Sequence, residues 1–275
     1  MSSINALSCA PAVRTWMENS SYPRILHVFD RVCNLIDERR EVLSIVTPGI
    51  GNGPFNLVVE EEVLFSAHIN ASSPVSIREN QIMLGDLTIH TARAKPWNPR
   101  PDWERLYARR DEILDQLLSL SLPDQQLPIP NIISSSLSFA LASEDISTAK
   151  TTASQIAGLG IGLTPTGDDF ILGAVLAAWI IHPLKIASKL AGEVTEIAAP
   201  LTTSLSGAWL RSAGRGEAGI RWHNLFNALI ASNKMAVQES VEQLLAVGYS
   251  SGADALAGFM GTFVRLREIS SHKIS

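Results

Sequence analysis

Two adjacent acids, Asp168 and Asp169, follow a glycine-rich turn in the middle of the chain. Residues 158–170 read Gly-Leu-Gly-Ile-Gly-Leu-Thr-Pro-Thr-Gly-Asp-Asp-Phe, and an apolar run continues to residue 181. A polar loop that leads into a buried helix presents backbone N–H groups and fixed carboxylates to a ligand. We predict that both acids are catalytic and that turn residues bind substrate, namely Gly162, Thr164, Thr166 and Gly167. In the alternative interpretation, Thr166 or Asp168 only caps the helix, although a cap needs one such residue.

The same pattern recurs towards the C-terminus. Thr-Gly-Asp-Asp at 166–169 precedes Gly173, and Ser-Gly-Ala-Asp at 251–254 precedes Gly258, so both fit [Ser/Thr]-Gly-x-Asp-x-x-x-Gly. Each match opens a nearly apolar helix with small residues, and we expect the two helices to pack side by side around one cavity. Asp254 is then the third catalytic acid, and the added binding residues are Ser250, Ser251 and Gly252. The alternative is a coincidental match in a chain rich in alanine and glycine.

Three ligand chemistries suit this mixture of groups. Helix N-termini favour a phosphate, but carboxylates repel it unless a cation mediates. Asp168, Asp169 and Asp254 are hard oxygen ligands of the type that Mg²⁺ accepts, so Mg²⁺ is a candidate cofactor, although none is certain. A small ligand with both a carboxylate and a ureido group would use donors and acceptors together. The residues alone leave these alternatives open.

Two further groups of residues are weaker candidates for substrate binding. Asn52 and Gly53 lie in a second glycine-rich loop, where turn formation explains them equally well. Arg211 stands near a run of glycines and is a candidate clamp for an anion, although an exposed helix end is the commoner explanation. The histidines show no metal-ligand spacing, and no P-loop, nucleophile elbow or dinucleotide fingerprint occurs.

Composition excludes several classes of protein. The formal net charge of −5 over 275 residues argues against a sequence-independent nucleic-acid binder. Two cysteines without CxxC spacing support neither a disulfide framework nor a structural zinc site. The first 17 residues lack the features of a signal peptide, and the apolar run at 170–181 is shorter than the roughly 20 residues that cross a membrane. We expect a soluble cytoplasmic protein with no membrane or nucleic-acid partner.

The elements that position these residues fall into two groups, which predicts an α+β protein. Residues 1–95 form a β-rich domain with a short helix at 4–19, and residues 96–275 form an all-helical domain. The predicted strands cover 24–36, 41–47, 55–60, 63–69, 75–78, 81–84 and 87–91. Their close spacing indicates an antiparallel barrel or sandwich, and the lack of crossover helices argues against parallel pairing.

Helical periodicity dominates the second group. The predicted helices cover 103–120 with Asp102 as its cap, 132–142, 144–157 with Ser143 as its cap, 168–182, 185–198, 201–213, 219–231, 234–247 and 252–267.

The motifs at 51–54, 158–170 and 248–258 resemble those of the AllH family, which is typified by a subunit of oxamate carbamoyltransferase from anaerobic allantoin degradation. The resemblance extends from about residue 24 to 266 and depends chiefly on the central motif. It implies a role in the phosphorolysis of oxalurate to oxamate and carbamoyl phosphate, by an enzyme with two other, unrelated subunits. The family motifs fall on residues 52–54, 164–169 and 250–254. The alternatives are a noncatalytic ligand-binding or scaffold subunit and a Mg²⁺-dependent phosphotransfer enzyme.

Overall fold

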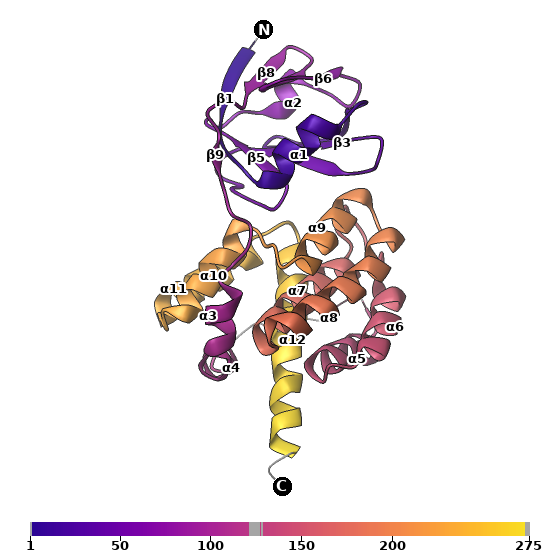
Figure 1. Cartoon of the computed structure of the whole chain (residues 1–275), viewed down its shortest axis with the longest axis vertical. Helices are drawn as coiled ribbons and strands as arrows, with labels where there is room; N and C mark the ends of the chain where they lie inside the picture. The colour runs from indigo at the N-terminus through magenta and orange to yellow at the C-terminus, as the bar shows by residue number, and fades with distance from the viewer. Residues whose placement is uncertain (1, 121–126, 128, 273–275) are drawn as a thin grey trace. The chain divides into compact units, whose positions relative to one another are not determined.

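The computed structural model describes residues 2–120, 127 and 129–272 (Figure 1). The chain divides into two compact units, Met1–Pro99 and Arg100–Ser275. The first is a nearly closed, barrel-like sheet with two short helices, and the second is helical. The predicted α+β class is therefore confirmed. No helix in the described part of the chain is both long and apolar enough to cross a membrane.

The sheet of the first unit has nine strands in the order β2-β3-β4-β5-β1-β8-β7-β6, with β9 paired to β1. The strands are β1 (Ser2–Cys9), β2 (Arg24–Val28), β3 (Val32–Ile36), β4 (Val42–Val46), β5 (Asn56–Val59), β6 (Val75–Arg78), β7 (Gln81–Leu84), β8 (Leu87–His90) and β9 (Lys95–Pro96). The core of the unit includes Ile4, Trp16, Leu35, Ile45, Leu57 and Ile89. Alternating β-branched residues place one face of the sheet in this core.

Most neighbouring strands pair antiparallel as predicted, but the expectation of no parallel pairing was wrong. β4 pairs parallel to β5, and β1 pairs parallel to both β8 and β9. Residues 47–55 join β4 to β5, and nine extended residues span about 30 Å. A loop of this length returns the chain along a short strand without a crossover helix.

Two local predictions in the first unit were also wrong. Residues 4–19 form a strand, β1, followed by helix α1 (Pro11–Asn19), rather than one helix. Pro11 does not interrupt the helix but begins it, where its missing N–H has no partner to lose. The predicted strand at 63–69 is instead the single turn α2 (Phe65–His68), which places the Phe65 ring fully in the core.

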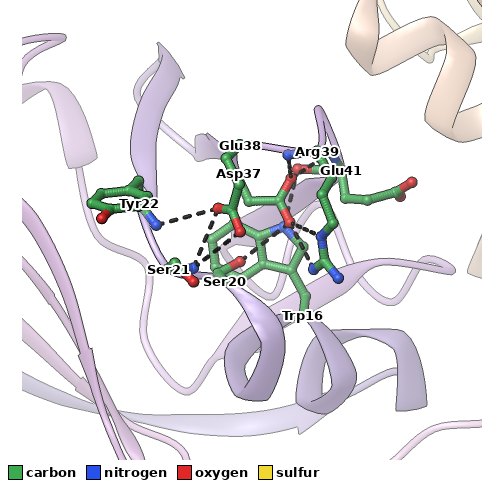
Figure 2. A network of polar contacts seen from close by, with 8 residues as sticks. All are labelled: Trp16, Ser20, Ser21, Tyr22, Asp37, Glu38, Arg39 and Glu41. Carbon is green, nitrogen blue, oxygen red and sulfur yellow. Dashed lines mark hydrogen bonds and ion pairs between the residues drawn. The ribbon is translucent and has the colours of Figure 1, made fainter.

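A dense set of polar contacts closes the turn between β3 and β4 (Figure 2). The buried Asp37 carboxylate accepts hydrogen bonds from the backbone N–H groups of Arg39 and Glu41, at 3.0 and 2.7 Å, and from the Arg39 guanidinium. The Trp16 indole of α1 donates to the Glu41 carbonyl, and the Glu38 carboxylate accepts from two backbone N–H groups that follow α1. These groups are hydrogen-bonded to one another, so the cluster fixes α1 to the sheet.

The second unit is built around one buried helix, α7 (Thr166–Ile181), in which every residue except Leu172 is buried. The other elements are α3 (Trp103–Ala108), α4 (Arg110–Leu118), α5 (Asn131–Ala142), α6 (Ile146–Ile156), α8 (Leu184–Ala198), the 3₁₀ turn η1 (Ala199–Leu201), α9 (Ser204–Gly214), α10 (Ile220–Ile230), α11 (Lys234–Leu245) and α12 (Ser251–His272). α7 packs against α12, α8, α9 and α5, and the apolar run at 170–181 is the centre of the core.

Helix caps agree with the predictions in part. Asp102 caps α3 as predicted, because its carboxylate accepts from the Arg105 N–H at 3.1 Å. The predicted helix at 103–120 is broken at Arg109, which ends α3 and precedes α4. Asp145 rather than Ser143 caps α6, accepting from the Thr148 N–H at 3.0 Å. Ser143 instead donates its hydroxyl to carbonyls of the preceding helix.

Candidate functional site

Helices α7 and α12 touch backbone to backbone through two glycines. A Cβ atom added to Gly173 of α7 would lie 1.7 Å from the Ala255 carbonyl oxygen of α12. Reciprocally, a Cβ atom added to Gly258 of α12 would lie 2.0 Å from the Phe170 carbonyl oxygen of α7. No other residue type allows so close an approach. The expected side-by-side packing of the two motif helices is therefore confirmed.

This crossing brings the N-terminal turns of α7 and α12 together. The Thr164 and Ser251 hydroxyl oxygens are 2.8 Å apart. Both hydroxyls hydrogen-bond to the Asp169 carboxyl group, and the charge of Asp254 acts on that same group. The structure thus brings together four of the predicted site residues. Thr164 lies just before α7 and Asp169 lies within it, while Ser251 and Asp254 belong to α12.

The two carboxyl groups of this cluster are buried and incompletely hydrogen-bonded. Asp169 is 8% exposed and Asp254 is 4% exposed. The Oδ2 atom of each residue has no hydrogen-bond partner within the described residues. Burying a carboxylate oxygen without a hydrogen-bond partner destabilises the fold by more than a typical hydrogen bond stabilises it. Two such atoms at one helix crossing make this cluster the candidate site.

Burial raises the pKa of Asp169 to about 8. The hydroxyls of Ser251 and Thr164 act in the opposite direction, and the nearby charges of Asp254 and Asp168 add to the increase. In the described part of the chain, no lysine, arginine or histidine forms an ion pair with Asp169 or Asp254. Asp169 therefore carries its proton at neutral pH.

Asp168 has a different environment, although it is adjacent in the chain. Its Oδ1 atom accepts from the Gly158 N–H at 2.8 Å, and its Oδ2 atom accepts from the hydroxyls of Thr202 and Ser206, the latter at 2.8 Å. Burial raises the pKa of Asp168, and the hydrogen bonds from Thr202, Gly158 and Ser206 oppose that increase. This carboxylate joins the glycine-rich loop to the start of α9. Its predicted catalytic role stays a prediction.

Helix capping does not explain the acids of the central motif. The residue that precedes α7 is Pro165, and no side chain caps the helix. Thr166 is buried, and its Oγ1 atom lies 3.2 Å from the position that a Cβ atom of Gly160 would take. Neither Thr166 nor Asp168 therefore serves as the cap of α7.

The loop between α6 and α7 presents free backbone N–H groups. Gly158, Gly160 and Gly162 have φ angles of +74°, +120° and +99°, and the residues between them do not have positive φ. The N–H groups of residues 160–163 form no backbone or side-chain hydrogen bond within the described structure. Successive backbone N–H groups without partners in a glycine-rich loop are the groups that bind an anion in many proteins.

The other motif glycines have packing roles. A Cβ atom on Gly167 would lie 1.9 Å from the Ile156 carbonyl oxygen, and one on Gly252 would lie 1.7 Å from the Leu244 carbonyl oxygen. Each glycine thus lets its helix start against the end of the preceding helix. Ser250 is exposed, and its carbonyl accepts from the Asp254 N–H at 2.8 Å.

Three predicted binding residues are not joined to this cluster by any described contact. The Arg211 guanidinium of α9 lies over Gly207, 3.5 Å from the position of its missing Cβ. Asn52 and Gly53 belong to the first unit, in the loop between β4 and β5, where the side-chain Oδ1 of Asn52 accepts from the Ser8 hydroxyl at 2.7 Å. Their role in binding substrate stays a prediction.

Sequence reasoning missed the hydroxyl-bearing segment before and within α9. Thr203 caps α9 and also donates its hydroxyl to the Leu163 carbonyl at 2.7 Å, while Thr202 and Ser206 bind Asp168. Four serines and threonines at residues 202, 203, 204 and 206 are a visible helix-start signal. That signal predicts a cap, and it does not identify the carboxylate that the neighbouring hydroxyls bind.

Comparison with known families covers both units. A family model described as oxamate carbamoyltransferase subunit AllH matches residues 156–263, which include α7, α12 and the loop between α6 and α7. A model described as the AllH family N-terminal domain matches residues 5–96. No solved structure matches the chain.

Proposed function

The chain belongs to the AllH family of oxamate carbamoyltransferase subunits, and from this premise we propose that Asp169 and Asp254 bind the carbamoyl-bearing substrate and that Asp169 acts as an acid. The observation that carries the proposal is the pair of buried carboxyl groups whose Oδ2 atoms lack partners. A ureido group has several N–H donors, and carboxyl oxygens are the acceptors that it requires. The substrate that fits the family is oxalurate, with phosphate as the nucleophile.

The free N–H groups of residues 160–163 supply the complementary half of the site. They would hold an anionic oxygen, either of phosphate or of the oxalurate carboxylate. Backbone donors of this kind also stabilise the charge that develops on a carbonyl oxygen during acyl transfer. Acceptors at the helix crossing and donors in the loop would thus orient one small molecule.

The proposed reaction moves one proton through Asp169. An oxygen of hydrogen phosphate forms a bond to the ureido carbon of oxalurate, and the bond from that carbon to the oxamate nitrogen breaks. Asp169 passes its proton to the departing nitrogen, and the proton that hydrogen phosphate loses returns to Asp169. Oxalurate and hydrogen phosphate become oxamate and carbamoyl phosphate, with atoms and charge balanced. A pKa of about 8 suits an acid that works near neutral pH.

Asp168 has a positioning role in this proposal. Its two oxygens hold Gly158, Thr202 and Ser206, so it fixes the loop whose N–H groups would bind the anion. A Mg²⁺-dependent phosphotransfer reaction that uses all three aspartates is less well supported. The described residues contain no group of three His, Cys, Asp or Glu side chains that could hold a metal ion. The remaining metal hypothesis is one Mg²⁺ ion held by Asp169 and Asp254 alone. Measuring turnover with and without a chelator tests it.

The decisive experiment replaces Asp169 with asparagine in the full chain, assembled with its companion subunits. Formation of carbamoyl phosphate from oxalurate and phosphate should fall by about 10²–10⁴-fold, the usual contribution of a general acid. The thermal midpoint should not fall, because asparagine has the size and neutrality of the protonated acid.

Asp168→Asn is the matched control. It replaces a carboxyl group whose oxygens accept from three donors, and it should cost about 1–3 kcal/mol of stability. If Asp169→Asn retains wild-type turnover, Asp169 is not the acid. If the wild-type chain binds oxalurate in calorimetry but never turns it over, even with its companion subunits, the chain is a ligand-binding subunit instead.

A further inference from the structure

One short segment of the candidate site is held at both ends and free in between. The Leu159 carbonyl accepts from the Gly167 N–H at 2.9 Å, and the Leu163 carbonyl accepts from the Thr203 hydroxyl at 2.7 Å. Between these two anchors, residues 160–162 form no backbone or side-chain hydrogen bond within the described structure. We name residues 160–162 the flap.

The two glycines of the flap differ in their surroundings. A Cβ atom on Gly160 would lie 2.6 Å from the Thr166 nitrogen, so Gly160 contacts the first residue of α7. A Cβ atom on Gly162 would meet nothing within 4 Å, and the φ angle of Gly162 is +99°. Packing therefore does not require glycine at position 162, whereas a backbone conformation that other residues rarely adopt does. Gly160 marks the fixed end of the flap, and Gly162 has the conformational freedom of a hinge.

The side chain between these glycines has no packing contact to lose. Ile161 is 95% exposed, so a movement of the flap uncovers no buried apolar side chain and breaks no described hydrogen bond. The flap is also close to the acid of α7. Gly160 contacts Thr166, and Asp169 follows three residues later, about 4.5 Å along the helix axis. A turn of the flap about its hinge therefore brings Ile161 within reach of the Asp169 carboxyl group.

We infer that the flap closes over the ligand bound beside Asp169 and Asp254, that its N–H groups bind the anionic group of this ligand, and that Ile161 excludes water. The inference rests on the proposed function, which supplies the ligand and the acid. An anion gives the free N–H groups their partners, and closure removes an apolar side chain from water. Both changes favour the closed form once the ligand is bound.

Exclusion of water has a chemical consequence for carbamoyl transfer. When water replaces phosphate as the nucleophile, its oxygen bonds to the ureido carbon, and the bond from that carbon to the oxamate nitrogen breaks. The products are then oxamate, carbamate and a proton. An open site would consume oxalurate in this way without forming carbamoyl phosphate. A closed flap leaves the bound phosphate as the nucleophile.

Thiol labelling tests the closure. The two native cysteines, Cys9 and Cys33, are both buried, so Ile161→Cys places the only exposed thiol of the chain on the flap. The full-length variant is labelled with a water-soluble thiol reagent, with and without millimolar oxalurate and phosphate. The ligands should slow labelling by about tenfold or more, as expected for a flap that is closed for about nine-tenths of the time. The thermal midpoint should equal that of the wild type, because Ile161 is exposed.

Two control variants separate closure from other effects of the ligands. Leu159→Cys lies in the same loop but outside the flap, at the anchor to Gly167, and Ile132→Cys lies on α5, where Ile132 is 81% exposed. Labelling at both control positions should keep its rate when the ligands are added. An unchanged rate at position 161 overturns the closure. Equal slowing at positions 159 and 161 also overturns it, because the ligand then only shields the loop.

Ile161→Ala measures the exclusion of water in the enzyme assembled with its companion subunits. In the wild type, oxamate and carbamoyl phosphate should appear at equal initial rates. In the variant, oxamate should form faster than carbamoyl phosphate, and equal rates overturn the role of Ile161.

Calorimetry on the wild-type chain separates this inference from the proposed function. Binding of oxalurate without protection of position 161 overturns the flap alone, whereas a chain that does not bind oxalurate overturns the proposed function and the flap together.

Discussion

Asp168 and Asp169 are neighbours with opposite surroundings. Asp168 accepts hydrogen bonds on both oxygens from Gly158, Thr202 and Ser206, whereas the Oδ2 atom of Asp169 has no partner. A buried carboxyl group whose two oxygens both accept hydrogen bonds contributes to the stability of the fold. A buried carboxyl group with an unpaired oxygen destabilises the fold, and such a group is retained where it has a function.

The pH dependence of stability follows from the raised pKa of Asp169. The pKa of an unfolded aspartate is about 3.9, whereas burial raises the pKa of Asp169 in the fold to about 8. Between these values the folded state holds a proton that the unfolded chain has lost. The stability contributed by this residue is therefore complete below about pH 4 and falls as the pH rises to about 8.

Urea unfolding across this range compares the wild type with Asp169→Asn. The variant is uncharged at every pH, so its free energy of unfolding should decline less with pH. It should exceed that of the wild type at about pH 9 by several kcal/mol, since each pKa unit corresponds to about 1.4 kcal/mol. Parallel curves for the two proteins would show that Asp169 has an ordinary pKa.

At the scale of elements, α7 and α12 form a pair whose contacts repeat with a constant offset. Gly173 meets Ala255, and Gly258 meets Phe170. Each glycine thus contacts the residue that follows the acid of the other helix. The two motifs are equivalent in space as well as in sequence, and the equivalence places Asp169 and Asp254 together. The small residues of the pattern are the cause of that placement.

Gly258→Ala tests this contact between helices. The added methyl group overlaps the Phe170 carbonyl, which is backbone and cannot rotate away, so α7 and α12 must separate. The expected cost is about 1–3 kcal/mol of stability, accompanied by a loss of turnover, because Asp254 moves with α12. Thermal unfolding and the carbamoyl phosphate assay measure the two effects.

Gly192→Ala on α8 is the control for this substitution. No atom lies within 4 Å of the position of its added Cβ, so alanine should stabilise the helix by about 0.5–1 kcal/mol. A neutral or stabilising effect of Gly258→Ala would contradict the observed approach of the two backbones.

The whole molecule has two hydrophobic cores. One lies within the sheet of Met1–Pro99, and the other surrounds α7 in Arg100–Ser275. A unit with its own core and its own backbone hydrogen bonds has what it requires to fold alone. The acidic cluster and the free N–H groups both belong to the second unit.

A fragment of residues 100–275 should therefore fold without the rest of the chain. We expect helical circular dichroism and one cooperative thermal transition, with unfolding enthalpy in proportion to its length. The fragment 1–99 should give a β-type spectrum and its own transition. A helical fragment without a cooperative transition would mean that its core needs the first unit.

Sequence patterns predicted most of the elements, and they failed where distant contacts decide a short segment. The helices of the second unit have long apolar stripes, so their periodicity identified them. The segment at 63–69 has too few residues for periodicity to discriminate, and it forms α2 because Phe65 enters a core built by other strands. The parallel pairing of β1 with β8 joins residues as far apart in sequence as Ser2 and Leu87, which local patterns cannot specify.

For the candidate site, the sequence by itself determined which helices meet and which residue types they bring. Glycine and aspartate recur at the same spacing in both motifs, and only glycine allows the backbones to touch. The tertiary structure alone decided that Asp168 is hydrogen-bonded while Asp169 has an unpaired oxygen. The partners of Asp168 include Thr202 and Ser206, 34 and 38 residues away, and a hydrogen bond exists only once the fold has brought its two ends together.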